Sequence, residues 1–229
     1  MPHRQSGNAL FITLIAIALF SALTMVMAKL ENAAEFDVDY EKMRAAVGQL
    51  TNFTTALETS LQKVKTFHGC SEDELDFYAD SYNSSNYQHA SINTKCQLFH
   101  PAGGGMTYIE ADDAILSNSG GDDYRITGQQ AVEGIGTDAA DLTFLATVTQ
   151  AACLFINQKL GIDDVAGAPP TDDDTAHDIT YAFNGANTVN GDYAATFTID
   201  HANVAGFNSG CVYDSDDDLY VYYDVILAR

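Results

Sequence analysis

The hydrophobic pattern of the chain begins with an apolar run from Ala9 to Ala28 that contains no charged side chain. As a helix, a run of roughly 20 residues is about 30 Å long, which matches the hydrocarbon thickness of a bilayer. His3 and Arg4 are the basic residues before the run, so the positive-inside rule leaves the N-terminus in the cytoplasm. The pattern therefore predicts a transmembrane segment followed by an exported remainder that begins near Lys29.

A cleavable secretory signal is the alternative interpretation of this run. Val26 and Ala28 are small residues at positions minus three and minus one of a cut before Lys29. Against this interpretation, the run is longer than the roughly 7–15 residues of a signal core, and no helix breaker separates it from the cut. The third possibility is that the N-terminus is not cleaved and the run remains a simple membrane anchor.

A helical pattern continues beyond the apolar run. Residues spaced alternately four and three apart form a stripe: Phe36, Tyr40, Met43, Val47, Leu50, Thr54, Leu57, Leu61 and Val64. Only Thr54 interrupts its apolar character. The sequence has no proline between Pro2 and Pro101, so we expect one helix over residues 8–67 with Gly48 as its weakest point. The stripe packs either on the chain's own head or against copies of the chain.

The start of the chain resembles a known family. A basic leader with Arg4 ends in Gly7 and runs directly into the apolar helix, as in the class III leader and stem of type IV pilins and pseudopilins. The resemblance implies that a prepilin peptidase cuts after Gly7, that Asn8 becomes the first residue, and that the stem packs into a filament or pseudopilus. The implied assembly residues are Leu10, Phe11, Leu14, Ile15, Ile17 and Ala18.

Two positions depart from the family pattern. Asn8 stands where the family usually has Phe or Met, and Ile12 stands at the fifth mature position, where a glutamate usually helps an incoming subunit to dock. Within the family this absence is tolerated best in minor or tip subunits. The resemblance therefore implies a pilin-like or pseudopilin-like subunit that is anchored in the bacterial inner membrane, has an extracytoplasmic head, and reaches the cell surface or an extracellular filament.

We expect three parts of the chain: a basic leader (1–7), a stem helix (8–67, with membrane and assembly segment 8–28) and a globular head (68–229). Alternating or β-branched stretches predict strands at Met106–Glu110, Tyr124–Thr127, Asp141–Val148, Ile179–Phe183, Tyr193–Ile199 and Leu219–Leu227, with a helix at Gln150–Leu160 and a loop at Ile162–Asp178. The predicted fold class is α+β and pilin-like: a long N-terminal helix, half transmembrane and half amphipathic, packed on a mainly antiparallel sheet with one further helix.

Charge narrows the range of partners. The 229 residues carry a formal net charge of -22, with a pI near 4.2. Such a surface repels phosphate backbones, so nucleic acid is not an expected partner. The apolar content of 46% is enough for a folded core. We expect partners to be copies of the chain or other pilin-like subunits.

The cysteines Cys70, Cys96, Cys153 and Cys211 all lie in the predicted head. Outside the cytoplasm an even number predicts two disulfides, with three possible connectivities. We favour Cys70 with Cys96 and Cys153 with Cys211. A cysteine at the start of a helix that is bridged to one near the C-terminus resembles the disulfide-bounded region of type IVb pilins.

Residues for other chemistry are few. Asp214, Asp216 and Asp218 alternate as at the start of a calcium loop, but the glycine at position six and the glutamate at position twelve are missing. Gly103–Gly105 lack the lysine of a phosphate-binding loop and predict a tight turn. No serine lies in a nucleophile elbow, so we expect no enzyme. The alternative function is a membrane-tethered or secreted extracytoplasmic binding module with calcium-binding acidic loops.

Overall fold

The computed structural model describes residues 7–79, 87, 93–117, 124–137, 139–176, 181–185 and 197–229. Within the first helix it describes the side chains of residues 13–15, 17, 19–21 and 39 onward. The elements are α1 (Gly7–His68), the short 3-10 helix η1 (Glu72–Glu74), β1 (Tyr124–Val132), β2 (Asp141–Val148), α2 (Gln150–Leu160), β3 (Thr171–Asp172), β4 (Phe197–Ile199), β5 (Ser209–Asp214) and β6 (Leu219–Leu227).

The chain divides into two compact units, Met1–Lys42 and Met43–Arg229. The C-terminal part of α1, residues 43–68, belongs to the second unit, and we call residues 7–42 its N-terminal part. The helix ends at His68 because Gly69 adopts a left-handed conformation with φ of 67°. The Cys70 amide then donates to the Val64 carbonyl at 3.4 Å, which caps the last turn.

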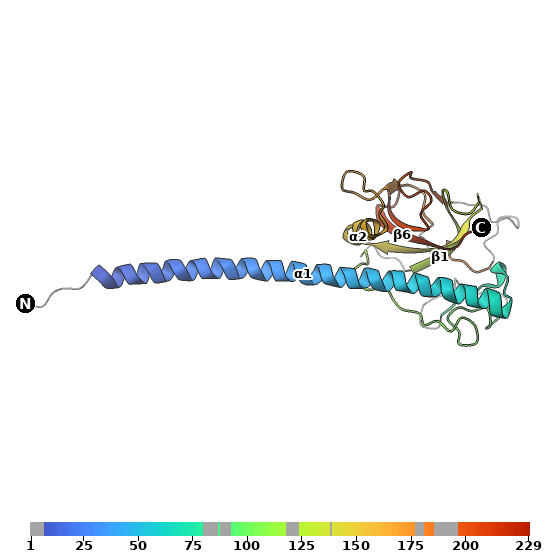
Figure 1. Ribbon diagram of the computed structural model, residues 1–229, viewed down its shortest axis with the longest axis horizontal. Coiled ribbons are helices and arrows are strands. Elements are labelled where there is room, and N and C mark those ends of the chain that lie inside the picture. The colour runs from blue at the N-terminus through green and yellow to red at the C-terminus, as the bar shows by residue number, and fades with distance from the viewer. Residues whose placement is uncertain are drawn as a thin grey trace, which may run out of the picture. The chain divides into compact units, whose positions relative to one another are not determined.

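The stripe of the C-terminal part of α1 packs on the chain's own sheet. Its described members have exposed fractions between 0% and 8%: Met43, Val47, Leu50, Thr54, Leu57, Leu61 and Val64. Tyr40, at the end of the first unit, is 40% exposed. Of the two interpretations of the stripe, packing on the own head is therefore correct for residues 43–64 (Figure 1).

Six strands form one mixed sheet in the order β3-β5-β6-β2-β1-β4. The three central pairings are antiparallel, whereas the outer strands β3 and β4 pair in parallel with β5 and β1. Hydrogen bonds between aspartate side chains and backbone amides link the two outer strands, β3 and β4. Asp172 accepts from the Asp200 amide at 3.1 Å, and Asp174 accepts from the Thr198 amide at 2.9 Å. The sheet is thereby curled into a nearly closed barrel.

Both faces of the sheet are buried. One face packs with α1 and α2 in a core that includes Phe144 and Tyr222, and the other encloses a second core that includes Leu145 and Tyr223. Neighbouring residues of a strand point to opposite faces, so β2 and β6 supply side chains to both cores. Figure 1 shows β6, β1 and α2 together on one side of the C-terminal part of α1.

The predicted fold class is wrong. The sheet is mixed and nearly closed rather than mainly antiparallel and pilin-like. In the part of the chain that the structure describes, no helix has the length and apolar character needed to cross a membrane. The sheet closes through β3 and β4, whose 2 and 3 residues are too short for a periodic signal.

The longer predicted elements are largely correct. β2, α2 and β6 have the predicted bounds, and β1 extends the predicted strand to Val132. α1 begins and ends within one residue of the predicted stem. β5 was not predicted, and β3 lies inside the predicted loop at Ile162–Asp178.

Three predicted strands differ from the structure. Residues 106–110 form no strand: Met106 and Tyr108 alternate because they pack against the core, without a pairing partner along the segment. In the described part of Ile179–Phe183, Ala182 makes one isolated bridge to Thr127. The first residues of Tyr193–Ile199 lie outside the described residues, and the last three form β4.

Candidate functional site

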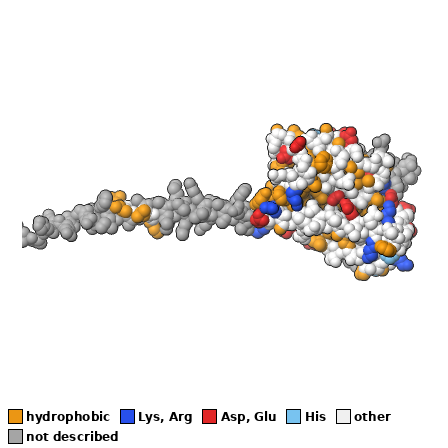
Figure 2. Space-filling model, viewed as in Figure 1, with side chains coloured by type: hydrophobic (Ala, Val, Ile, Leu, Met, Phe, Trp, Pro, Cys, Tyr) orange, Lys and Arg blue, Asp and Glu red, His pale blue; other side chains and the backbone are white. Residues whose placement is uncertain are grey.

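The N-terminal part of α1 presents large apolar side chains to solvent. Leu14, Ile15 and Ile17, which the resemblance implies in assembly, are 63%, 44% and 65% exposed, and Leu19 and Phe20 are 66% and 69% exposed. They are the orange atoms among the grey ones of the helix in Figure 2. Soluble proteins rarely leave contiguous apolar side chains uncovered without an interaction to make. These five residues are a candidate assembly surface.

The other predicted residues of this region are less fully described. Gly7 and Asn8 are the first two residues of α1, and their side chains lie outside the described residues. The side chains of Leu10, Phe11 and Ala18 also lie outside them. The predicted cleavage between Gly7 and Asn8 stays a prediction.

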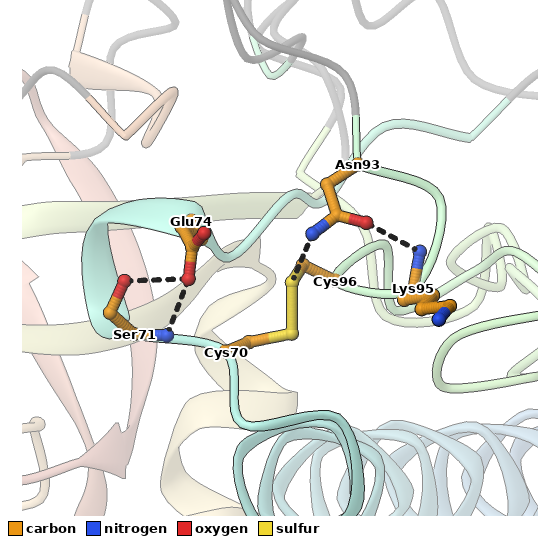
Figure 3. Close-up of a disulfide and its surroundings, with 6 residues drawn as sticks. All are labelled: Cys70, Ser71, Glu74, Asn93, Lys95 and Cys96. Atoms are coloured by element: carbon orange, nitrogen blue, oxygen red, sulfur yellow. Dashed lines mark hydrogen bonds between the residues drawn. A yellow bond between two sulfur atoms is a disulfide. The ribbon is translucent and has the colours of Figure 1, made fainter.

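The disulfide between Cys70 and Cys96 fastens the end of α1 to the following segment (Figure 3). Just beyond Cys70, the Glu74 carboxylate accepts from the Ser71 amide at 2.9 Å and from its hydroxyl at 2.8 Å. On the other side, the Asn93 side-chain amide donates to the Cys96 sulfur at 3.2 Å, while its oxygen accepts from the Lys95 amide. Both favoured cysteine pairings are confirmed, since Cys153 is bonded to Cys211.

The second disulfide joins α2 to β5. Thr149 caps the start of α2 by accepting from the Ala152 amide, and Gly161 ends it with φ of 75°. Asn157, one turn after Cys153, exchanges two hydrogen bonds with the backbone of Cys211, at 2.8 and 2.9 Å. α2 is therefore fixed to the sheet by a covalent bond and two buried hydrogen bonds.

A pair of carboxyl groups links α1 to β6. Glu58 lies on α1 and Asp224 on β6, and burial together with the neighbouring carboxyl raises the pKa of Glu58. Burial also raises the pKa of Asp224, although hydrogen bonds with Thr54, Tyr222 and Glu58 oppose the shift. The Tyr222 hydroxyl donates to Asp224 at 2.9 Å. Thr54, the polar interruption of the stripe, thus lies where the helix meets this acidic pair.

A second titratable group is buried at the start of β2. Burial raises the pKa of Asp141 to about 6, although the backbone amide of Arg229 donates to its carboxylate at 2.9 Å. The Arg229 guanidinium pairs with Glu72 at 3.0 Å. Glu72 also pairs with Lys65, and these two cations hold the pKa of Glu72 low despite its burial. Arg229 therefore connects the strand region to the segment that follows α1.

The three predicted calcium ligands lie at the β5–β6 turn. Asp214 is buried, and it accepts from the Thr175 hydroxyl and from the amides of Asp216 and Asp217. Asp218 accepts from the Tyr213 hydroxyl at 2.7 Å, and Asp216 is exposed. The described residues contain no group of three or more acidic, His or Cys side chains placed to hold a metal ion. The alternating aspartates form and brace the turn.

A long apolar groove runs beside the C-terminal part of α1. Its two adjoining hollows measure about 550 and 460 Å³ and share Asn52, Ala56 and Met106. We call it the α1 groove, and its lining residues are Ala45, Gly48, Gln49, Asn52, Phe53, Thr55, Ala56, Thr59, Ser60, Lys63, Gly104, Gly105, Met106, Thr107 and Ile109.

The glycine turn at Gly103–Gly105 forms one wall of this groove. A Cβ on Gly104 would lie 2.0 Å from the Ser60 hydroxyl oxygen, so only glycine allows the turn to come this close to the helix. The Lys63 ammonium donates to the Gly104 carbonyl at 2.9 Å. The predicted tight turn is confirmed, and its function in the fold is to place residues 104–109 beside α1.

Sequence reasoning missed the carboxyl pair and the α1 groove as sites. For the pair, the available signal was Thr54, a hydroxyl in an otherwise apolar stripe. For the groove, the signal was Gly48 in the middle of a helix. Neither signal identifies the contact partner, because Asp224 lies far away in the sequence and residues 104–109 form neither a helix nor a strand.

Comparisons with protein-family models, with curated proteins and with solved structures found no match to this chain.

Proposed function

We propose that this protein is a structural subunit that assembles through the N-terminal part of α1 with copies of itself or with related subunits. The observation that carries the proposal is the exposure of Leu14, Ile17 and Leu19, each above 60%, on a helix with no charged residue between Asn8 and Ala28. Burying such a side chain stabilises an assembly by about 1.5–3 kcal/mol. The resemblance of the leader and stem to those of pilins and pseudopilins supports the same proposal.

The second unit supports an extracytoplasmic location. Its two disulfides are of the kind that form and persist in oxidising compartments. In the proposal, a prepilin peptidase processes the chain after Gly7, and the disulfide-fastened unit is displayed on the assembly at the cell surface. The lack of a glutamate at Ile12 favours a minor or tip subunit over the main component of a fibre.

The mature N-terminus tests the processing step. Mass spectrometry of the protein recovered from its native host should show Asn8 as the first residue. A chain that begins at Lys29 would have lost the apolar surface, and the proposal would then be wrong.

Assembly itself is tested with Ile17→Asn, which places a polar group on the exposed surface. Electron microscopy of sheared surface material should show assemblies with the wild-type chain and none with the variant. Gln62→Asn, an exposed change on the C-terminal part of α1, is the matched control and should leave assembly intact. Equal assembly by wild type and Ile17→Asn would exclude this surface.

A further inference from the structure

We infer that the α1 groove of one subunit receives the N-terminal part of α1 of a second copy. The inference rests on the proposed function and names the surface that the exposed helix contacts. Because groove and helix are different surfaces of the same chain, each copy can offer its helix to one neighbour and its groove to another. Such a head-to-tail contact generates a ring if its rotation closes and an open, repeating assembly if it does not.

The shape of the groove comes from small side chains on α1. Ala45, Gly48 and Ala56 leave the helix backbone exposed along the side that faces residues 106–109. Gly48 is unusual because glycine within a helix is less stable than alanine. Its φ is not in the left-handed region, and a Cβ placed there would meet nothing within 4 Å. Among the residues that the structure describes, no contact requires this glycine, whereas a second helix that approaches closely would.

The charges of the two surfaces are compatible. The chain carries 32 acidic residues against 10 basic ones, so contacts between acidic surfaces of two copies are repulsive. The lining of the α1 groove contains no Asp or Glu, and its Lys63 donates to the Gly104 carbonyl. The helix run Asn8–Ala28 contains no charged residue. Apart from the α-amino group that cleavage after Gly7 leaves on Asn8, the helix run can therefore enter this groove without electrostatic repulsion from its lining.

The chemistry and length of the two surfaces also match. Phe53, Met106 and Ile109 give the groove an apolar floor and edge, and Ile109 is 40% exposed. From Ala45 to Lys63 the groove follows α1 for about 27 Å, and the run Asn8–Ala28 is about 30 Å long as a helix. The exposed side chains Leu14, Ile17 and Phe20 thus find large apolar side chains in one hollow of the groove, and small or hydroxyl-bearing residues line most of the other.

The test fills the groove without disturbing the fold. Gly48→Leu and Ala56→Leu each add an apolar side chain in the groove, and Gln62→Leu adds the same side chain at an exposed helix position outside it. All three are made in the full chain, next to Ile17→Asn. Assembly is measured by sedimentation and electron microscopy, and folding by thermal unfolding of the unassembled protein.

We expect Gly48→Leu and Ala56→Leu to reduce the assembled fraction at least tenfold, with unfolding temperatures equal to or above that of the wild type. Gln62→Leu should assemble normally. If both groove variants assemble like the wild type while Ile17→Asn does not, the inference is wrong and the proposed function stands. If Ile17→Asn also assembles normally, both are wrong.

A second measurement does not depend on loss of assembly. A photo-crosslinking amino acid at Gln49, which lines the groove, is irradiated in the assembled protein, and the joined peptides are identified by mass spectrometry. Crosslinks between position 49 of one copy and residues 9–28 of another support the inference. Crosslinks to any other segment of a neighbouring copy, with none to residues 9–28, overturn it.

Discussion

The two parts of α1 carry similar apolar side chains in different surroundings. In the C-terminal part, Leu57 and Leu61 are fully buried against the sheet, whereas in the N-terminal part Leu14 and Leu19 are 63% and 66% exposed. The pattern of the sequence is apolar and helical in both. A hydrophobic stripe therefore shows that a helix face favours burial against other apolar side chains, but only the fold shows whether the same chain supplies them.

Two parts of the chain pack against the C-terminal part of α1. The sheet packs on the stripe through residues such as Phe144 and Tyr222, while residues 98–109 lie on another side and are held by the Cys70–Cys96 disulfide. Phe53 lies between these two parts of the chain. Its ring stacks on that of Tyr124, with 5.2 Å between the ring centroids, and it also contacts the rings of Phe99 and Tyr108.

The largest expected effect is that of truncating a buried leucine. Leu57→Ala removes a fully buried side chain and should lower the free energy of unfolding by about 3–4 kcal/mol, because transfer energy is lost and a cavity remains. Leu19→Ala, the matched change in the N-terminal part, should alter it by less than about 0.5 kcal/mol. Urea unfolding followed by circular dichroism measures both. Similar losses in the two variants would mean that Leu19 is also buried.

The Cys70–Cys96 disulfide should have the next largest effect, confined to the C-terminal part of α1. The Cys70→Ala, Cys96→Ala double variant frees a loop with a sequence separation of 26 and should lower the free energy of unfolding by about 2–3 kcal/mol. Hydrogen exchange should quicken at residues 57–68 and stay unchanged at residues 13–21. Faster exchange in both regions would show that the two parts of the helix unfold together.

The sequence predicted much of the second unit because its long elements have clear periods. The stripe from Met43 to Val64, the alternation of β6 and the caps of α2 each determine local structure from nearby residues. The even number of cysteines in the head predicted two disulfides and left three connectivities open, and the structure shows the two pairs that we favour. These predictions depend on short-range patterns or on pairing of one residue type.

The closure of the sheet could not be predicted in this way. Asp172 and Asp174 connect β3 to β4 through backbone amides at Asp200 and Thr198, and an acidic run in the sequence has the same appearance as a solvated loop. Likewise, the α1 groove depends on where the glycine turn at Gly104 packs, which is a tertiary contact with Ser60. The candidate assembly surface lies within a continuous apolar run of the sequence, and its role in assembly stays a prediction.

A smaller effect is expected at Gly48, in the C-terminal part of α1. Gly48→Ala should raise the free energy of unfolding by about 0.5–1 kcal/mol, since alanine favours the helix and a Cβ there meets no atom within 4 Å. Thermal unfolding of the unassembled protein measures the gain. An unchanged or lower stability would reveal a contact at Gly48 within the chain, and the glycine would then need no partner to explain it.

The smallest effect concerns the Glu58–Asp224 pair, which fastens the C-terminal part of α1 to β6. Both pKa values are raised, so the stability that the pair contributes is fully present below the unfolded pKa of about 4 and is lost as the pH rises through the raised values. Glu58→Gln removes the repulsion between the two ionised carboxyls. Because Glu58 is partly exposed, solvent screening limits the expected gain at pH 7 to about 0.5 kcal/mol.

Unfolding of both proteins between pH 4 and pH 8 measures this contribution. The difference in free energy of unfolding between variant and wild type should appear only as the pH rises. Asp141, whose pKa is about 6, contributes equally to the stability of both proteins, so its contribution drops out of this difference. No side chain between Asn8 and Ala28 titrates in this range. Assembly should therefore keep the same pH dependence in Glu58→Gln as in the wild type, and a change in it would indicate that the carboxyl pair also influences the assembly surface.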